Sequence, residues 1–342
     1  MNYRVDGEKI QFHPERVVQW KKAKTWEEAK NVYPIYVEIS PVGACNHRCT
    51  FCAVDYIGYK SNMLDAGLLG NRLLEMGSLG VKSVMFAGEG EPLLHKDINE
   101  MVTAADVAGI DVSFTTNGVL LDKLDLTGVS WVKVSLNAGT KKTYAKVHRT
   151  KEKDFDTVWT NIYEAAKRKG NCDLGVQMLL LPENVHEVQE LYDRCNDLGV
   201  DYLVVKPYSQ HKKSLTHEYE GQKPPEPSVI ERGCKFIFRK ETYETQTIPY
   251  KKCRATPNFW AYIMATGDVY SCSAYLLDDR FNLGNINLHS FSDIWTGPAR
   301  QKNWNFVRES LDIHECRVNC RMDKVNRYLD ELVVGPHGVN FI

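Results

Sequence analysis

Short apolar runs alternate with helical patterns through the first 210 residues, and this alternation restricts the fold of the chain more than any other feature. The apolar runs are partly β-branched, which is typical of parallel strands covered on both faces. The pattern predicts βα units around a parallel sheet, and six units are too few for a closed eight-stranded barrel. The predicted strands span residues 35–40, 83–87, 112–115, 131–136, 175–181 and 202–206, and the predicted helices span 68–76, 98–108, 155–169 and 185–198.

Three closely spaced cysteines, Cys45, Cys49 and Cys52, directly follow the first predicted strand. The spacing C-x3-C-x2-C lets three thiolates hold one face of an iron–sulfur cube and leaves the fourth iron open. An open iron can bind a small molecule through its amine and carboxylate. One alternative is a zinc site, which normally needs a second cysteine or histidine pair close by. The other is cysteines that are simply packed in a core.

The run from Gly43 to Cys52, with the aromatic Phe51 before its last cysteine, resembles the signature of the radical S-adenosylmethionine (SAM) superfamily. In that family the reduced cluster breaks the sulfonium of SAM and releases a 5′-deoxyadenosyl radical. The resemblance implies an α/β chain with a partial (β/α)6 TIM-like barrel, followed by a small α+β iron–sulfur domain. It also implies that Phe51 flanks the adenine of SAM, and that the cysteine loop lies at the carboxyl end of the first strand.

A second motif follows the second predicted strand and resembles the Gly-x-Gly-Glu-Pro motif of the same family. It consists of Gly88, Glu89, Gly90, Glu91 and Pro92. Glycine allows the backbone to approach a ligand closely, and a carboxylate can accept hydrogen bonds from an ammonium group. By resemblance, Glu91 binds the methionyl amine of SAM and the two glycines shape the site around it. The alternative is a βα turn in which glycine serves only the backbone geometry.

Polar residues at the ends of the third and fourth predicted strands fit a nucleoside-binding role. As family positions, Asn117, Ser135 and Asn137 contact the ribose or the methionine carboxylate of SAM, and Arg149 is a possible carboxylate partner. Polar turn residues often only shape loops, and arginine is most often a surface residue. Met178 either flanks the adenine or belongs to the core.

Four further cysteines lie beyond a proline-rich segment at residues 221–227, which marks a domain boundary. The prediction is an N-terminal extension (1–32), a core barrel (33–220) and an auxiliary domain (221–342). Residues 263–270 read as a hairpin with a Gly-Asp turn. The layout resembles SPASM and twitch extensions, so the implied cofactors are SAM and two 4Fe–4S clusters. The implied ligands of the auxiliary cluster are Cys253, Cys272, Cys316 and Cys320.

Three cysteines remain outside this scheme. Cys172 and Cys195 lie next to or within predicted helices and are interpreted as packing residues. Cys234 is a substitute cluster ligand, a hydrogen-atom donor or a packing residue, and the last is favoured. The histidines are scattered without H-x-x-x-H pairing, which suggests no separate metal site.

Charge and hydropathy limit the classes of partner that the chain is expected to bind. The formal net charge of −1 gives no overall basic field that would recruit nucleic acid. No apolar run approaches a membrane span, and the start of the chain lacks the apolar core of a signal peptide. We therefore expect a cytoplasmic protein with no membrane or nucleic-acid partner, because thiols stay reduced in the cytoplasm.

The expected reaction is hydrogen abstraction from a small polar substrate, a carbohydrate or nucleotide sugar, followed by oxidation assisted by the auxiliary cluster. The cysteine layout resembles a twitch-type alcohol dehydrogenase, and residues 320–329 resemble radical enzymes encoded among surface-polysaccharide genes. Such a dehydrogenase-like oxidoreductase needs a reductant such as flavodoxin or ferredoxin. The sequence identifies no catalytic acid or base.

Two alternatives remain open. A peptide-modifying radical SAM enzyme is one, although the short segment before residue 35 leaves no room for an N-terminal peptide-recognition domain. An iron–sulfur electron carrier or a zinc-stabilised binding module is the other, and neither would need Glu91 beside an open iron.

Overall fold

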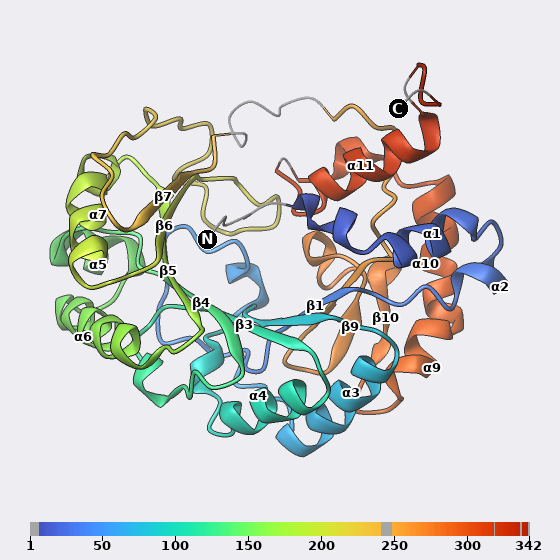
Figure 1. Cartoon of the computed structure of the whole chain (residues 1–342), viewed down its shortest axis with the longest axis horizontal. Helices are drawn as coiled ribbons and strands as arrows, with labels where there is room; N and C mark the ends of the chain where they lie inside the picture. The colour runs from blue at the N-terminus through green and yellow to red at the C-terminus, as the bar shows by residue number, and fades with distance from the viewer. Residues whose placement is uncertain (1–6, 241–247, 318, 336, 341–342) are drawn as a thin grey trace.

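One curved ten-stranded sheet organises the chain (Figure 1). The structure is a computed structural model that describes residues 7–240, 248–317, 319–335 and 337–340. The strand order of the sheet is β10-β9-β8-β1-β2-β3-β4-β5-β6-β7, so β1 to β6 lie side by side in chain order. The six strands are β1 (Tyr36–Ile39), β2 (Ser83–Phe86), β3 (Asp111–Thr116), β4 (Val129–Ser135), β5 (Asp173–Leu180) and β6 (Tyr202–Pro207).

All pairings among these six strands are parallel. Each predicted strand is present and ends within two residues of its expected bounds, so the α/β partial barrel is confirmed. A seventh strand, β7 (Lys235–Phe238), pairs in parallel with β6 and was not predicted. Its four residues are too few to show a period against the loop sequence around them.

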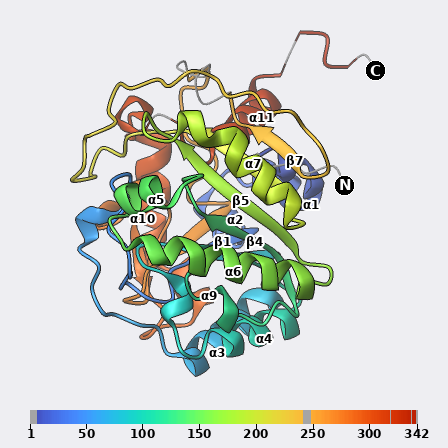
Figure 2. The ribbon, with the colours of Figure 1, turned by 90° about the vertical axis from the view of Figure 1, so that its left-hand side faces the viewer.

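Helices cover the convex side of the sheet (Figures 1 and 2). Figure 2 shows α6 and α7 lying across β5 on this side. Apolar residues of the strands and helices together form the main core, in which Leu69, Phe114 and Val176 are completely buried. The helices of this layer are α3 (Ala66–Ser78), α4 (Ile98–Val107), α5 (Lys141–His148), α6 (Glu152–Arg168) and α7 (Val188–Asp197).

The C-terminal part extends the same sheet. Strand β8 (Trp260–Ile263) pairs in parallel with β1, and β9 (Asp268–Tyr270) and β10 (Asn282–Asn285) continue antiparallel. The predicted hairpin is therefore confirmed, with Gly267 at φ +87° in its turn. The proposed boundaries of the two domains stay a prediction.

A second layer of helices packs at the β10 end of the sheet, on the right in Figure 1. Ile10 and Val17 from the N-terminal segment pack with Val325 and Leu329 of the last helix, so the two ends of the chain share one apolar cluster. The described helices include none that is long and apolar enough to cross a membrane. The helices of this layer are α1 (Pro14–Lys22), α2 (Trp26–Ala29), α9 (Phe291–Thr296), α10 (Pro298–Glu309) and α11 (Asp323–Val334).

Candidate functional site

The loop after β1 holds Cys45, Cys49 and Cys52 as free, half-buried thiols. Two backbone hydrogen bonds tie this loop to α5: Arg48 N–H donates to the His148 carbonyl at 3.1 Å, and Thr50 N–H donates to the Val147 carbonyl at 2.9 Å. The loop is therefore held at the carboxyl edge of the sheet, where parallel α/β folds place their sites.

The three thiols share one environment. Burial raises the pKa of Cys45 to about 11, and the nearby Glu91 and Cys52 add to the rise. Burial likewise raises the pKa of Cys49 well above its usual value, with Cys52 and Cys45 contributing. Thiols that disfavour one another's ionisation need a cation to become thiolates together. This set of soft donors fits three corners of an iron–sulfur cluster.

Glu91 lies beside this loop and is almost completely buried. Its backbone N–H donates to the Ala44 carbonyl at 2.9 Å. Its carboxylate accepts from the Thr116 hydroxyl at 2.6 Å, the Asn117 N–H at 2.8 Å and the Leu93 N–H at 3.1 Å. Burial raises the pKa of this carboxyl, and the bond from Asn117 is the largest opposing effect.

Both glycines of the second motif are required by close packing. A Cβ on Gly90 would lie 2.2 Å from the Val42 carbonyl oxygen and 2.3 Å from that of Ala44. Gly88 has φ +120°, and its Cβ would lie 2.4 Å from Cβ of Ser40. The motif therefore contacts the loop that follows β1, which carries the cysteines, through bare backbone.

The other predicted cofactor residues divide into two groups. Asn117 lies near the loop, because its Nδ2 donates to Asn46 Oδ1 at 2.6 Å. Arg149 is exposed and lines a hollow of about 500 Å³ together with Arg48 and Cys49. Half-buried Phe51 packs edge-on against His148, with ring centroids 5.4 Å apart.

Asn137 is enclosed by protein, and Ser135 lies half-buried at the end of β4. The Asn137 side chain accepts from the Leu179 N–H at 2.7 Å and lies 3.4 Å from His148 Nε2. Through these contacts Asn137 connects the end of β4 to β5 and to His148. Met178 is fully buried in the main core, as one of its two interpretations expected.

Two histidines that the sequence did not connect meet beside Cys49. One ligand atom each of His47, Cys49 and His148 lie within 4.8 Å of one another, and His148 Nδ1 is 3.3 Å from the Cys49 sulfur. Burial lowers the pKa of His47 to about 4 and that of His148 to about 3. Both imidazoles are therefore neutral at pH 7. Their separation in sequence hides this arrangement from any spacing rule.

The four C-terminal cysteines also come together. Burial raises the pKa of Cys272 well above its usual value, and Cys320, Cys253 and Cys316 all contribute. Their sulfurs lie near hydrogen-bond donors: Asn326 Nδ2 at 3.6 Å from Cys253, the Met322 N–H at 3.4 Å from Cys320, and the Tyr275 hydroxyl at 3.3 Å from Cys316. Four convergent thiols with donors around them fit a closed four-iron cluster.

The remaining cysteines are buried in the main core. Cys172 and Cys195 have the packing role that the sequence predicted. Cys234 lies beside Cys195, whose pKa is raised first by burial and then by Cys234. This position favours the packing interpretation of Cys234.

Sequence reasoning missed a group of unpaired polar side chains on the concave side of the sheet. Glu89 is buried, and its Oε1 accepts from the Ala265 N–H at 2.9 Å, while its Oε2 has no hydrogen-bond partner among the described residues. Burial raises the pKa of this carboxyl to about 7. Within the described part of the chain, the hydroxyls of Tyr262 and Tyr56 are also buried without hydrogen-bond partners. Both residues lie close enough to Glu89 for its charge to add to the rise that burial causes in their pKa. The only sequence clue was the position of Glu89 inside the second motif.

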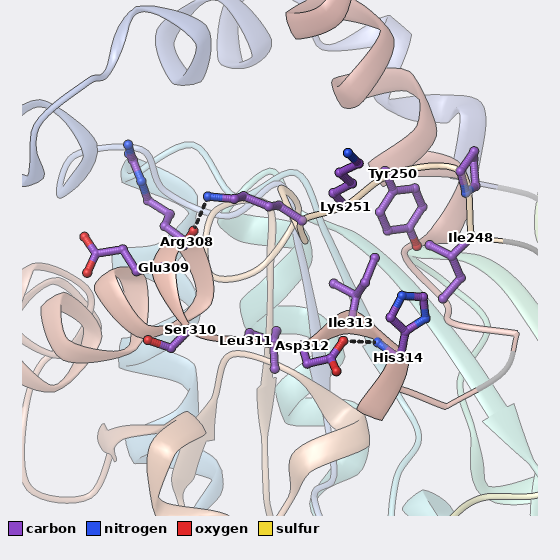
Figure 3. A pocket seen from close by; sticks show the side chains of 12 residues that line it. Ile248, Tyr250, Lys251, Arg308, Glu309, Ser310, Leu311, Asp312, Ile313 and His314 are labelled. Carbon is purple, nitrogen blue, oxygen red and sulfur yellow. Dashed lines mark hydrogen bonds between the residues drawn. The ribbon is translucent and has the colours of Figure 1, made fainter.

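A second hollow of about 500 Å³ lies between two segments of the C-terminal part of the chain (Figure 3). Residues 248–252 form one wall and residues 308–314 the other, and Lys252 Nζ joins them by donating to the Arg308 carbonyl at 2.8 Å. None of the predicted site residues lines it.

A parallel partial barrel with three thiols and a buried carboxylate at one edge, and four more thiols near its C-terminus, defines an iron–sulfur protein. Comparison with protein families gives the particular class. Residues 39–195 match the Radical SAM superfamily, and residues 253–321 match SPASM, an iron–sulfur cluster-binding domain. The chain therefore carries a Radical SAM domain and a SPASM domain. These matches assign SAM and two 4Fe–4S clusters as its cofactors.

Curated relatives include GTP 3′,8-cyclases. The Chlorobaculum tepidum enzyme is 30% identical over 54% of this chain and 58% of its own length. A probable GTP 3′,8-cyclase of Sulfurisphaera tokodaii is 28% identical over 79% of this chain and 88% of its own length. The match thus spans less than two thirds of the first of these relatives.

Solved structures share the fold. Streptococcus suis SuiB bound to S-adenosylmethionine aligns with a TM-score of 0.62 and 20% identity, over 90% of this chain and 75% of SuiB. Native anSMEcpe with AdoMet and the Cp18Cys peptide aligns with a TM-score of 0.55 and 18% identity, over 86% of this chain and 88% of that one. At these identities the likeness extends to the fold alone.

Proposed function

We propose that this chain is a radical SAM enzyme that abstracts hydrogen from a small polar substrate, a carbohydrate or nucleotide sugar, and oxidises it. The observation that carries the proposal is the contact of the Glu91 segment with the cysteine loop, which sets a buried carboxylate beside three thiols. A reductant such as flavodoxin or ferredoxin supplies electrons.

The proposed ligands of the SAM-binding cluster are Cys45, Cys49 and Cys52, and those of the auxiliary cluster are the four C-terminal cysteines. When bound, the reduced cluster supplies the electron that cleaves SAM to methionine and a 5′-deoxyadenosyl radical. Glu91 accepts hydrogen bonds from the SAM ammonium, since its oxygens are held in place by Thr116, Asn117 and Leu93. Arg149, at the hollow beside Cys49, pairs with the SAM carboxylate.

Gly88 and Gly90 let the backbone lie close to SAM, while Phe51, Asn117, Ser135 and Asn137 complete the proposed nucleoside site. Asn137 acts here mainly by fixing the backbone after β4, because its amide is engaged by Leu179.

Oxidation of an alcohol carbon removes a hydrogen atom, which the 5′-deoxyadenosyl radical would take, an electron, which the auxiliary cluster would accept, and a proton. Glu89 is placed to take the proton, because its free Oε2 lies in the unpaired group with Tyr56 and Tyr262. A carboxyl whose pKa is near 7 suits a general base at neutral pH. The relatives' named substrate, GTP, is a phosphorylated nucleoside, and this favours a nucleotide-linked substrate over a peptide.

The test is anaerobic reconstitution followed by reduction with dithionite in the presence of SAM. The protein should hold about eight iron per chain and form 5′-deoxyadenosine and methionine. Cys49→Ala should abolish cleavage, whereas Cys172→Ala, a buried thiol outside both sites, should not. Zinc in place of iron, or full iron without cleavage, would overturn the proposal.

The substrate class is tested with a panel of deuterated nucleotide sugars and peptides. Deuterium should appear in 5′-deoxyadenosine only with a nucleotide sugar. Transfer from a peptide would instead identify a peptide-modifying enzyme.

A further inference from the structure

Two lysines project from the face of the sheet that is turned away from the helices. Lys133 lies in β4 between Val132 and Val134, which are both fully buried in the helix-covered core. Since side chains alternate along a strand, Lys133 faces the concave side. By the same alternation, Lys206 follows the buried Val205 in β6 and faces that side too. Parallel strands of this kind are normally apolar on both faces, so these lysines need a reason.

Two arginines enlarge this group. The Arg239 N–H donates to the Val205 carbonyl at 2.9 Å, which places Arg239 beside Lys206. Arg317 comes from the segment between the 3₁₀ turn at Ile313–Glu315 and α11. All four side chains are half-buried. We name as the basic cluster the residues Lys133, Lys206, Arg239 and Arg317.

The members of the basic cluster lie close enough to repel one another. Burial lowers the pKa of Lys206 well below its usual value, and the charges of the other three members lower it further. Burial also lowers the pKa of Lys133 to about 8, and Arg239 contributes. An anion between these groups would relieve the repulsion and favour the charged form of both lysines.

No carboxylate pairs with the basic cluster in the part of the chain that the structure describes. Glu38, on the same face of β1, is already paired with Arg321. Lys133 Nζ lies 5.6 Å from the centre of the Trp131 ring, and Nε of Arg317 is buried with no hydrogen-bond partner among the described residues. Because partly buried cations are unfavourable without a counter-charge, this arrangement indicates an anion that the described residues do not supply.

We propose that the basic cluster binds the phosphate groups of the substrate, which makes the substrate a phosphorylated compound of the nucleoside diphosphate sugar type. This inference rests on the proposed function and specifies which part of the substrate the site recognises. Four basic groups can balance the two or three negative charges of a pyrophosphate. A substrate with a single carboxylate would neutralise only one of the four basic groups.

The position of Arg317 gives the orientation of this substrate. Arg317 directly follows Cys316, one of the four C-terminal thiols, in the chain. The basic cluster therefore adjoins these thiols, and its lysines lie on the same concave side of the sheet as Tyr262. A substrate with its phosphates on the basic cluster would extend its sugar hydroxyls towards Glu89 and Tyr262.

The experiment is calorimetric titration of the reconstituted protein, with SAM present, by inorganic pyrophosphate, inorganic phosphate and succinate. Pyrophosphate should bind most tightly and succinate least, with proton uptake on binding seen as a dependence of the heat on the buffer. Lys206→Met and Arg317→Met should each weaken pyrophosphate binding at least tenfold. Lys96→Met, which removes a lysine with an 81% exposed side chain, should leave it unchanged.

Iron content and far-ultraviolet circular dichroism show that each variant has folded. If Lys206→Met fails to fold, Lys206→Arg tests the same point, because it keeps the charge and should bind within a few fold of wild type. Equal binding of succinate and pyrophosphate, or unchanged affinity in both Met variants, would overturn the inference. Wild-type protein that cleaves SAM but binds no pyrophosphate contradicts this inference alone. Protein that binds pyrophosphate but cannot cleave SAM contradicts the proposed function alone.

Discussion

The backbone N–H of Glu91 donates to the carbonyl oxygen of Ala44, the residue before Cys45, at 2.9 Å. This bond joins the segment after β2 to the loop after β1. It fixes the carboxylate relative to the three thiols before any cofactor binds, and pre-organisation of this kind reduces the entropy lost on binding.

Glu91→Gln should weaken SAM binding without loss of iron. The amide keeps the shape of the carboxylate but loses its charge, and its NH2 group meets the donors of Thr116, Asn117 or Leu93. A charge-assisted hydrogen bond contributes about 1.5–3 kcal/mol, so the dissociation constant should rise roughly ten- to hundredfold. Equilibrium titration with SAM measures this. Glu100→Gln, on the exposed face of α4, is the matched control, and equal affinities in both variants would count against Glu91 as amine ligand.

Gly90→Ala should displace the cysteine loop, because the new Cβ would lie within 2.3 Å of two backbone carbonyl oxygens. Overpacking against backbone destabilises by about 1–3 kcal/mol, and iron incorporation should fall with it. Gly67→Ala in the exposed first turn of α3 meets only the Asp65 carboxylate at 3.5 Å and should be neutral or slightly stabilising. Thermal unfolding and iron content are measured for both variants. Equal stability and equal iron content in Gly90→Ala and Gly67→Ala would contradict the prediction.

Glu89 should make stability depend on pH. Its folded pKa of about 7 lies above the ordinary value of 4.5, so folding favours the protonated carboxyl. The resulting stabilisation is fully present below pH 4.5 and is lost as pH rises towards 7. Between pH 5.5 and 7 the wild type should lose about 2 kcal/mol of unfolding free energy relative to Glu89→Gln. Unfolding midpoints of both proteins across pH 5.5–8.5 measure this, and parallel curves would refute the raised pKa.

Replacing Cys316 and Cys320 together with alanine should lower iron from about eight to about four per chain, given one four-iron cluster per site. Cys45, Cys49 and Cys52 lie in the separate loop after β1, so the iron that they are proposed to hold should stay while substrate turnover stops. Iron analysis with Mössbauer spectroscopy distinguishes the two clusters. The control for loss of an unrelated buried thiol is Cys195→Ala. Retention of both clusters in the double variant would show that the C-terminal thiols have another role.

The strands of the barrel were predictable because their apolar runs are buried on the helix side, as Val132 and Val134 are in β4. The cysteine sets were predictable because ligand spacing is local. The contact of His47 with His148, and the grouping of Glu89 with Tyr262, depend on tertiary packing between segments far apart in sequence. Lys133 and Lys206 are visible in the sequence as single charged residues inside apolar strands. Only the structure shows which face of the sheet each of them occupies.

The central claim is that Cys45, Cys49 and Cys52 leave one iron open for SAM. Electron–nuclear double resonance on the reduced protein, with SAM carrying ¹⁵N at its methionyl amine, tests this directly. The account predicts a ¹⁵N coupling to the cluster in wild-type protein that disappears in Cys49→Ala. Absence of any ¹⁵N coupling in wild-type protein with full iron and saturating SAM would contradict it.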